Sequence, residues 1–239
     1  MTAANTFGHD FFCDVIAFHE TNKHSWEEIS KRIPTMPKGW MELCALQRED
    51  RIEFTRLFWQ QTLEGLTFDC SDYVRRLDLF FARITNIEVF ATKTLPNMPY
   101  EVQMIYTWGD DEYFFYGAAP ARTEAIEQVT RQFGQLLLPA DFLSFYCIHD
   151  GFCSLLDGGV IPTNHLARRH REFQENCQLD PLLPFYESTQ PDRFQCFFVH
   201  NKRQTKMGNV SYCQMDPTVD QTELFSTFNE WLLYYLEKL

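Results

Sequence analysis

Three neighbouring segments constrain the fold more than any other part of the sequence. The segments ITNIEVFATK (84–93), YEVQMIYTW (100–108) and EYFFYGA (112–118) are rich in β-branched and aromatic residues, and GDDE stands between the last two. Such segments are typical of β-strands, and a short stretch of Gly and Asp between two of them is typical of a turn. They predict a β-meander in the middle of the chain.

The residues before this meander indicate helices. HSWEEISKRI has the Ser-x-x-Glu pattern of a capping box, formed by Ser25 and Glu28. PKGWMEL and REDRIEFTRLFWQQTL are also predicted to be helical. The second of these helices is expected to turn one apolar side to the core. This side comprises Ile52, Leu57, Phe58, Trp59 and Leu63.

The segment GAAPAR (117–122) is the best candidate for an internal boundary, and two helices are expected to follow it. In the first, TEAIEQVTRQFG, Thr123 is the expected N-cap and Gly134 the expected end. The second begins near Pro139, carries aromatic residues at helical spacing and is expected to end at Gly151.

The rest of the chain combines both kinds of element. PDRFQCFFVHN and GNVSYCQMD predict a pair of strands, and TNHLARRHREFQEN is either a short helix or a loop. STFNEWLLYYLEKL predicts a last helix, because its apolar residues recur at intervals of three and four. We therefore expect an α+β fold, with residues 1–120 as a helical and β-hairpin extension and residues 121–239 as a second domain.

Composition and charge exclude several classes of function. The formal net charge is -12 and is spread over both halves of the chain, so a phosphate backbone would be repelled and a basic protein is the better partner. No stretch is long and apolar enough to span a bilayer, and Asp14 interrupts the apolar run of a start that lacks a basic segment, so no membrane span and no standard secretory signal are expected. The eight cysteines include no CxxC pair, which favours reduced structural thiols and a cytoplasmic location.

The stretch IHDGFCSLLDGGV (148–160) concentrates groups that could carry chemistry. A metal site is disfavoured because neither a paired zinc-ligand set nor the alternating acidic ligands of a calcium loop is present. A nucleophile is disfavoured because Cys147 and His149 are two residues apart and diverge on a helix. A structural interpretation fits best: Asp150 and Gly151 end a helix, with His149 near its last carbonyls as a favourably placed cation, and Asp157, Gly158 and Gly159 form a second turn.

No catalytic, cofactor-binding or metal-ligating residue can be assigned from the remaining sequence. A G-x-S-x-G elbow, a P-loop and a G-x-G-x-x-G fingerprint are all missing, and the carboxylates are scattered. We therefore expect no enzyme activity, no cofactor and no structural metal.

The order of elements in the C-terminal half resembles the SUKH superfamily, which includes bacterial immunity proteins and fungal cell-wall-synthesis regulators. The resemblance rests on TEAIEQVTRQFG, LPADFLSFYCIHDGF, GGVIPTNHL, LLPFYESTQPDRFQCFFV, GNVSYCQMD and LFSTFNEWLLYYL, which cover about residues 120–239. It implies a mixed or antiparallel sheet with helices on one side, and a protein-binding module without catalysis. The family pattern differs at Pro191, where a turn glycine is usual, and at Asp150, where Asn is commoner.

These observations lead to one expected function and two alternatives. The resemblance implies a non-enzymatic interaction module, an immunity or regulatory protein that binds a toxin, an effector or a regulator. The alternatives are a secretion chaperone for an effector and a small hydrolase that uses a Cys or His. Asp110, Asp111 and Glu112 lie at the predicted hairpin tip, where they either only solvate the turn or meet a basic partner.

Overall fold

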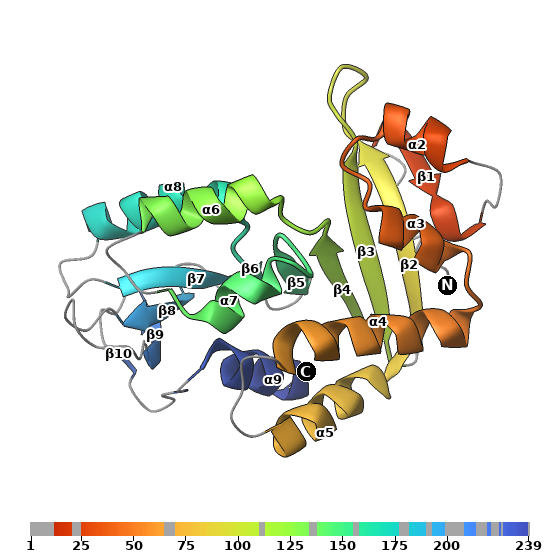
Figure 1. Ribbon diagram of the computed structural model, residues 1–239. Helices are drawn as coiled ribbons and strands as arrows, with labels where there is room; N and C mark the ends of the chain where they lie inside the picture. The colour runs from red at the N-terminus through yellow and green to blue at the C-terminus, as the bar shows by residue number, and fades with distance from the viewer. Residues whose placement is uncertain are drawn as a thin grey trace.

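The computed structural model describes residues 12–20, 25–64, 70–109, 113–133, 138–154, 158–176, 182–189, 193–198, 208–213, 219–220, 225 and 227–238 (Figure 1). The strands of these residues form a ten-stranded sheet, in which each strand pairs antiparallel with its neighbours in the chain. The strands are β1 (Asp14–Ala17), β2 (Ile84–Lys93), β3 (Glu101–Trp108), β4 (Tyr113–Ala118), β5 (Phe152–Ser154), β6 (Gly158–Val160), β7 (Leu182–Ser188), β8 (Arg193–Phe198), β9 (Gly208–Cys213) and β10 (Val219–Asp220). The predicted α+β class and the antiparallel sheet are confirmed.

Helices pack on this sheet and on one another. They are α2 (Trp26–Arg32), α3 (Lys38–Cys44), α4 (Arg48–Glu64), α5 (Cys70–Phe81), α6 (Thr123–Gln132), α7 (Ala140–Phe145), α8 (Thr163–Asn176) and α9 (Phe228–Lys238), with a short 3-10 turn η1 (Phe18–Glu20). Helices α3 and α4 contact β2, and α4 also contacts α5 and α7, while α9 contacts α5 and α7 (Figure 1). This group of helices joins the N-terminal and C-terminal parts of the chain. None of the described helices has both the length and the apolar character needed to cross a bilayer.

The opposite face of the sheet carries a helix as well. Phe197 of β8 packs against Phe142 of α7, whereas Phe194 packs against Phe173 of α8. Phe194 and Phe197 are three residues apart on a regularly paired strand, so their side chains point to opposite faces. Helices therefore flank both faces at β8, and not one side alone as the resemblance implied.

The local predictions for the meander and for two helices are confirmed. Strands β2, β3 and β4 cover the three segments that were predicted as strands. Ser25 and Glu28 form the complete capping box of α2, in which each side chain accepts from the other residue's backbone N–H. The elements that the sequence did not predict include β1, η1, β5, β10 and α5, the last of which starts within the segment FDCSDYVRR.

The sheet and the core both continue across the expected boundary at residue 120. Strand β4 pairs with β5 through Phe115, Tyr116 and Gly117. One cluster of buried apolar residues extends from Ile16 to Leu236. The two expected parts therefore share one sheet and one core.

Two expected helix details are wrong. Thr123 is the first residue of α6, and Arg122 precedes it without a side-chain hydrogen bond to the helix, so Thr123 is not the N-cap. The expected end of this helix, Gly134, lies outside the described residues. The helix that begins at Pro139 ends at Phe145, because the following residues form tighter turns, in which Cys147 N–H donates to Ser144 and Ile148 N–H to Phe145.

Gly151 therefore lies well beyond the helix that it was expected to end. Its φ is nonetheless +99°, the left-handed region that favours glycine. Its backbone carbonyl accepts from Ala118 N–H at 3.0 Å, so the residue links the turns that follow α7 to the end of β4.

The substitution Gly151→Val is expected to lower the free energy of unfolding by about 1 to 2 kcal/mol, because a β-branched side chain resists positive φ. The new Cβ would also lie 3.3 Å from Cβ of Pro162. Urea unfolding of both proteins measures the difference, and an unchanged midpoint and slope would contradict the conformation described for this residue.

Candidate functional site

His149 lies in the interior, with only 1% of its surface exposed. Its backbone N–H donates to Phe145 O at 3.0 Å, and Asp150 N–H donates to Ala119 O at 3.2 Å. The turns after α7 thus hold the imidazole against the end of β4. His149 therefore does lie near the last carbonyl of α7, but the expected cation at this helix end is wrong, because burial lowers the pKa of the imidazole to about 4.

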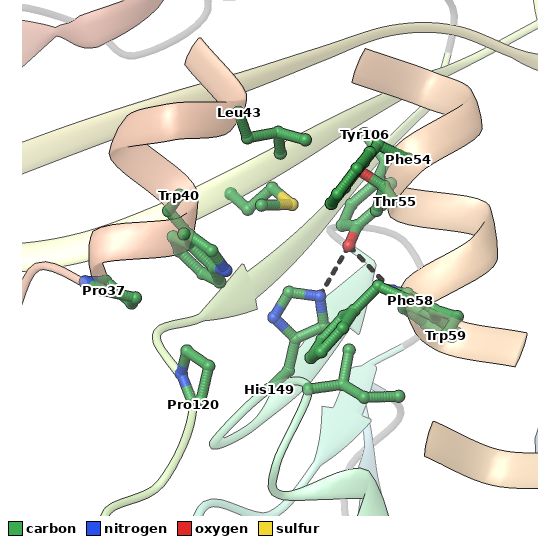
Figure 2. A pocket seen from close by; sticks show the side chains of 13 residues that line it. Pro37, Trp40, Leu43, Phe54, Thr55, Phe58, Trp59, Tyr106, Pro120 and His149 are labelled. Carbon is green, nitrogen blue, oxygen red and sulfur yellow. Dashed lines mark hydrogen bonds between the residues drawn. The ribbon is translucent and has the colours of Figure 1, made fainter. Parts of the chain in front are cut away.

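The imidazole and two other buried side chains, Tyr106 and Trp59, form a chain of hydrogen bonds (Figure 2). His149 Nδ1 lies 3.0 Å from Ala118 O, and Nε2 lies 2.7 Å from the hydroxyl oxygen of Tyr106. Because a carbonyl oxygen can only accept, Nδ1 carries the proton, and Nε2 accepts from the Tyr106 hydroxyl. That hydroxyl accepts in turn from the indole N–H of Trp59, at 3.1 Å.

This network is electrically neutral at neutral pH. Burial lowers the pKa of His149 to about 4, although the hydrogen bond with Ala118 O acts in the opposite direction. Burial also raises the pKa of Tyr106 far above its ordinary value. Neither group therefore has a pKa near 7, where a general acid or base is most effective.

A glycine of β4 makes room for the imidazole. A Cβ atom on Gly117 would lie 2.3 Å from both Cε1 and Nδ1 of His149. The ring packs edge-on against Trp40 and Trp59, with centroid distances of 5.6 and 5.7 Å. Helices α3 and α4 and strand β4 therefore all shape the site.

The network forms the floor of a pocket of about 260 Å³ between α3 and α4. Helix α3 and the residue before it contribute Pro37, Gly39, Trp40 and Leu43. Helix α4 contributes Phe54, Thr55, Phe58 and Trp59. The sheet and its connections contribute Met104, Tyr106, Pro120, Ile148 and His149 (Figure 2). Ligand sites are typically concave and mostly apolar with a few convergent polar groups, and this pocket has that character.

Two phenylalanines of the pocket are exposed to solvent. Phe54 and Phe58, one turn apart on α4, are 63% and 42% exposed. Leu57 next to them is 39% exposed, so the expectation that Leu57 and Phe58 would face the core is wrong. Exposed apolar side chains gathered at one place commonly mark a binding site.

The polar residues of α4 explain why Leu57 and Phe58 are exposed, although Trp59 and Leu63 on the same helix are buried as expected. Arg51 is buried and donates to the backbone oxygens of Ile87, at 2.6 Å, and Leu46, at 3.1 Å. Thr55 is also buried, and its hydroxyl donates to Arg51 O at 2.8 Å. Arg51 and Thr55 therefore occupy the buried side of α4, where the pattern of apolar residues in the sequence had placed Leu57 and Phe58.

Of the residues that the stretch 148–160 singled out, His149 lines this pocket, whereas Asp150, Gly151, Gly158 and Gly159 do not. Asp110, Asp111, Glu112 and Asp157 lie outside the described residues. Asp150 accepts from the backbone N–H and the hydroxyl of Thr163, at 2.7 and 2.9 Å, and so caps the start of α8.

Gly158 and Gly159 belong to β6 itself, and so do not form a turn that opens the strand. A Cβ atom on Gly158 would lie 2.1 Å from Glu187 O, and one on Gly159 would lie 2.4 Å from Cβ of Cys153. Both glycines thus allow neighbouring chain to approach closely, which is a packing role and not a site.

The sequence did not predict that Trp59, Tyr106 and His149 meet in one site. Trp59 and Tyr106 are 47 residues apart, and Tyr106 and His149 are 43 apart, so no local motif contains them. The available signal was the aromatic neighbourhood of His149, in FLSFYCIHDGF, which is unusual for a solvated histidine.

In the described part of the chain, no three His, Cys, Asp or Glu side chains are grouped so that they could hold a metal ion. No protein-family model matches the chain, and no curated protein or solved structure is significantly similar to it.

Proposed function

We propose that the protein is a non-enzymatic interaction module of SUKH type, which binds a protein partner at the pocket between α3 and α4. The observation that carries the proposal is the uncharged aromatic pocket with Phe54 and Phe58 exposed at its opening. Aromatic side chains that fill or rim a pocket contribute much of the free energy of binding at protein interfaces. The partner would be a toxin, an effector or a regulator, and the protein an immunity or regulatory protein.

Two further observations support this proposal. The order of helices and strands from α6 to α9 follows the order on which the SUKH resemblance rests. The net charge of -12 favours a basic partner, and Asp110, Asp111 and Glu112 are proposed to speed its approach by electrostatic attraction.

The state of the thiols favours binding over hydrolysis. Burial raises the pKa of Cys44 to about 12, and desolvation raises that of Cys147. A nucleophilic cysteine needs the opposite shift, because the thiolate is the reactive form. His149 remains neutral and its two nitrogens are already hydrogen-bonded, so it is poorly placed to activate either thiol.

Site-specific crosslinking tests the proposal. A photoreactive phenylalanine analogue replaces Phe58, and the same analogue replaces Leu95, which is 54% exposed in the loop between β2 and β3. We expect the partner protein to be captured at position 58 and not at position 95, because only position 58 borders the pocket.

The captured protein is then purified and its affinity is measured. Phe54→Ala/Phe58→Ala is expected to weaken binding about 30-fold or more, which is the effect of losing an interface hot spot. Leu95→Ala/Met98→Ala removes two exposed apolar side chains elsewhere and should leave the affinity unchanged. Equal affinities for both double variants would exclude the pocket as the binding surface.

A further inference from the structure

The two hydroxyl groups at the floor of the pocket have no proton left to donate. The Tyr106 hydroxyl proton is used by His149 Nε2, and the Thr55 hydroxyl proton is used by Arg51 O. The Tyr106 oxygen already accepts from the Trp59 indole N–H, whereas the Thr55 oxygen keeps unused acceptor capacity. An occupant with a hydrogen-bond donor at its inner end is therefore complementary to this floor, and one with an acceptor there is not.

The occupant must also be neutral. Among the described residues that line the pocket, none is charged at neutral pH, because His149 is held in its neutral form. A carboxylate or an ammonium group would lose its hydration in this pocket without gaining a charged partner.

The size of the pocket favours a ring system larger than benzene. An apolar cavity of ~150 Å³ is known to bind benzene, and this pocket measures about 260 Å³. The additional volume accommodates a second fused ring. Figure 2 shows the indole nitrogen of Trp40 turned toward the His149 ring, against which Trp40 packs edge-on at 5.6 Å.

The rim indicates that this ring belongs to a polypeptide. The outer side of α4 exposes three apolar residues that are close together in the sequence, Phe54, Leu57 and Phe58. A free small molecule inside the pocket would leave Leu57 in water, whereas a chain that carries the ring would cover it. Around this rim the charges compensate one another, as in the ion pairs of Lys38 with Glu42 and of Arg56 with Glu53. A neutral, apolar contact matches such a surface.

From these steps we infer that the pocket holds the indole ring of a tryptophan of the partner protein, with the indole N–H directed at the hydroxyl oxygen of Thr55. This inference rests on the proposed function, because it names the group by which the proposed partner is anchored.

Small probes test the chemistry of the pocket without the partner. N-acetyl-tryptophanamide is titrated into the protein, and binding is followed by the NMR signals of the pocket residues. Its N1-methyl derivative, which lacks the donor, is expected to bind about fivefold more weakly, as is typical for the loss of one hydrogen bond. Indole-3-acetate and tryptamine, which carry a charge, are expected to bind more weakly than the neutral amide.

A matched variant identifies the acceptor. Thr55→Val keeps the shape of the side chain and removes its oxygen, so it should reduce the preference for N–H over N-methyl. Leu95→Ala serves as the control and should preserve that preference. Tighter binding of indole-3-acetate, or equal binding of the N–H and N-methyl probes, would overturn the inference about the occupant.

Substitution in the partner separates this inference from the proposed function. Each tryptophan of the crosslinked partner is replaced by leucine, and one replacement is expected to weaken the complex at least about 30-fold. If the partner binds at Phe54 and Phe58 but tolerates every replacement, the indole assignment is wrong and the proposed function stands. If the probes bind and no protein is captured at position 58, the pocket serves a free ligand, and both proposals fail.

Discussion

Lowering the pH from 7 to 4 is expected to destabilise the fold by about 3 kcal/mol through His149 alone. The pKa of this histidine is about 4 in the folded protein, against 6.5 for an ordinary histidine. Between these two values the unfolded chain binds a proton that the folded protein does not. The stability is therefore complete above pH 6.5 and is lost as the pH falls toward 4.

Urea unfolding at a series of pH values measures this effect. His149→Gln removes the titrating group. The free energy of unfolding of this variant, expressed relative to its value at pH 7, should therefore fall less steeply between pH 6.5 and 4 than that of the original protein. His170→Gln is the matched control, since burial also lowers the pKa of His170 but this residue lies outside the pocket. Parallel curves for the original protein and His149→Gln would show that His149 is not the buried neutral group described.

A direct measurement remains possible if His149→Gln does not fold. The imidazole NMR signals of His149 should stay constant between pH 7.5 and 5, because the folded protein binds no proton at this ring in that range. A titration centred near pH 6.5 would contradict the network with Tyr106.

Gly117→Ala is expected to lower the free energy of unfolding by about 3 kcal/mol. The added methyl group would lie 2.3 Å from His149 Nδ1, and the ring is held in place by hydrogen bonds on both nitrogens. The ring must therefore move and leave Tyr106 or Ala118 without its partner. Because the ring is part of the pocket floor, the same variant should also lose affinity for the tryptophan probe.

Gly39→Ala is the matched control for this substitution. Gly39 also lines the pocket, but a Cβ atom at this position meets nothing within 4 Å. It lies in α3, where alanine favours the helix over glycine by up to about 1 kcal/mol. The change in the free energy of unfolding, measured by thermal unfolding, should have opposite signs in the two variants. A similar loss of stability in both would mean that His149 does not confine Gly117.

The sequence by itself determined those elements whose cause is local. The strands at 84–93, 101–108 and 113–118 follow from β-branched and aromatic residues on either side of turn residues, and the turn brings neighbouring strands together. The capping box of α2 needs only the spacing of Ser25 and Glu28. Likewise, the apolar stripe of α9 predicted the buried side of that helix correctly, as shown by Phe228, Trp231 and Leu232.

Only the tertiary structure decided which side of α4 is buried. Arg51 can be buried because it meets the carbonyl oxygen of Ile87, 36 residues further along the chain. A periodicity argument cannot include such an acceptor, since it counts apolar residues and treats a charged residue as exposed. This is why Phe58 was expected in the core and is found at the opening of the pocket.

The site also depended on the tertiary structure, because it is formed by contacts between residues that are far apart in the sequence. His149 follows a helix, and its place in the sequence suggested a cation near the last carbonyls, but the space left by Gly117 and the hydroxyl of Tyr106 hold a neutral imidazole inside. Trp59 reaches the network from a third element, α4. The pairing of β3 with β4 and the packing of α4 bring these residues together, and the resulting burial, which no local segment encodes, keeps the imidazole neutral.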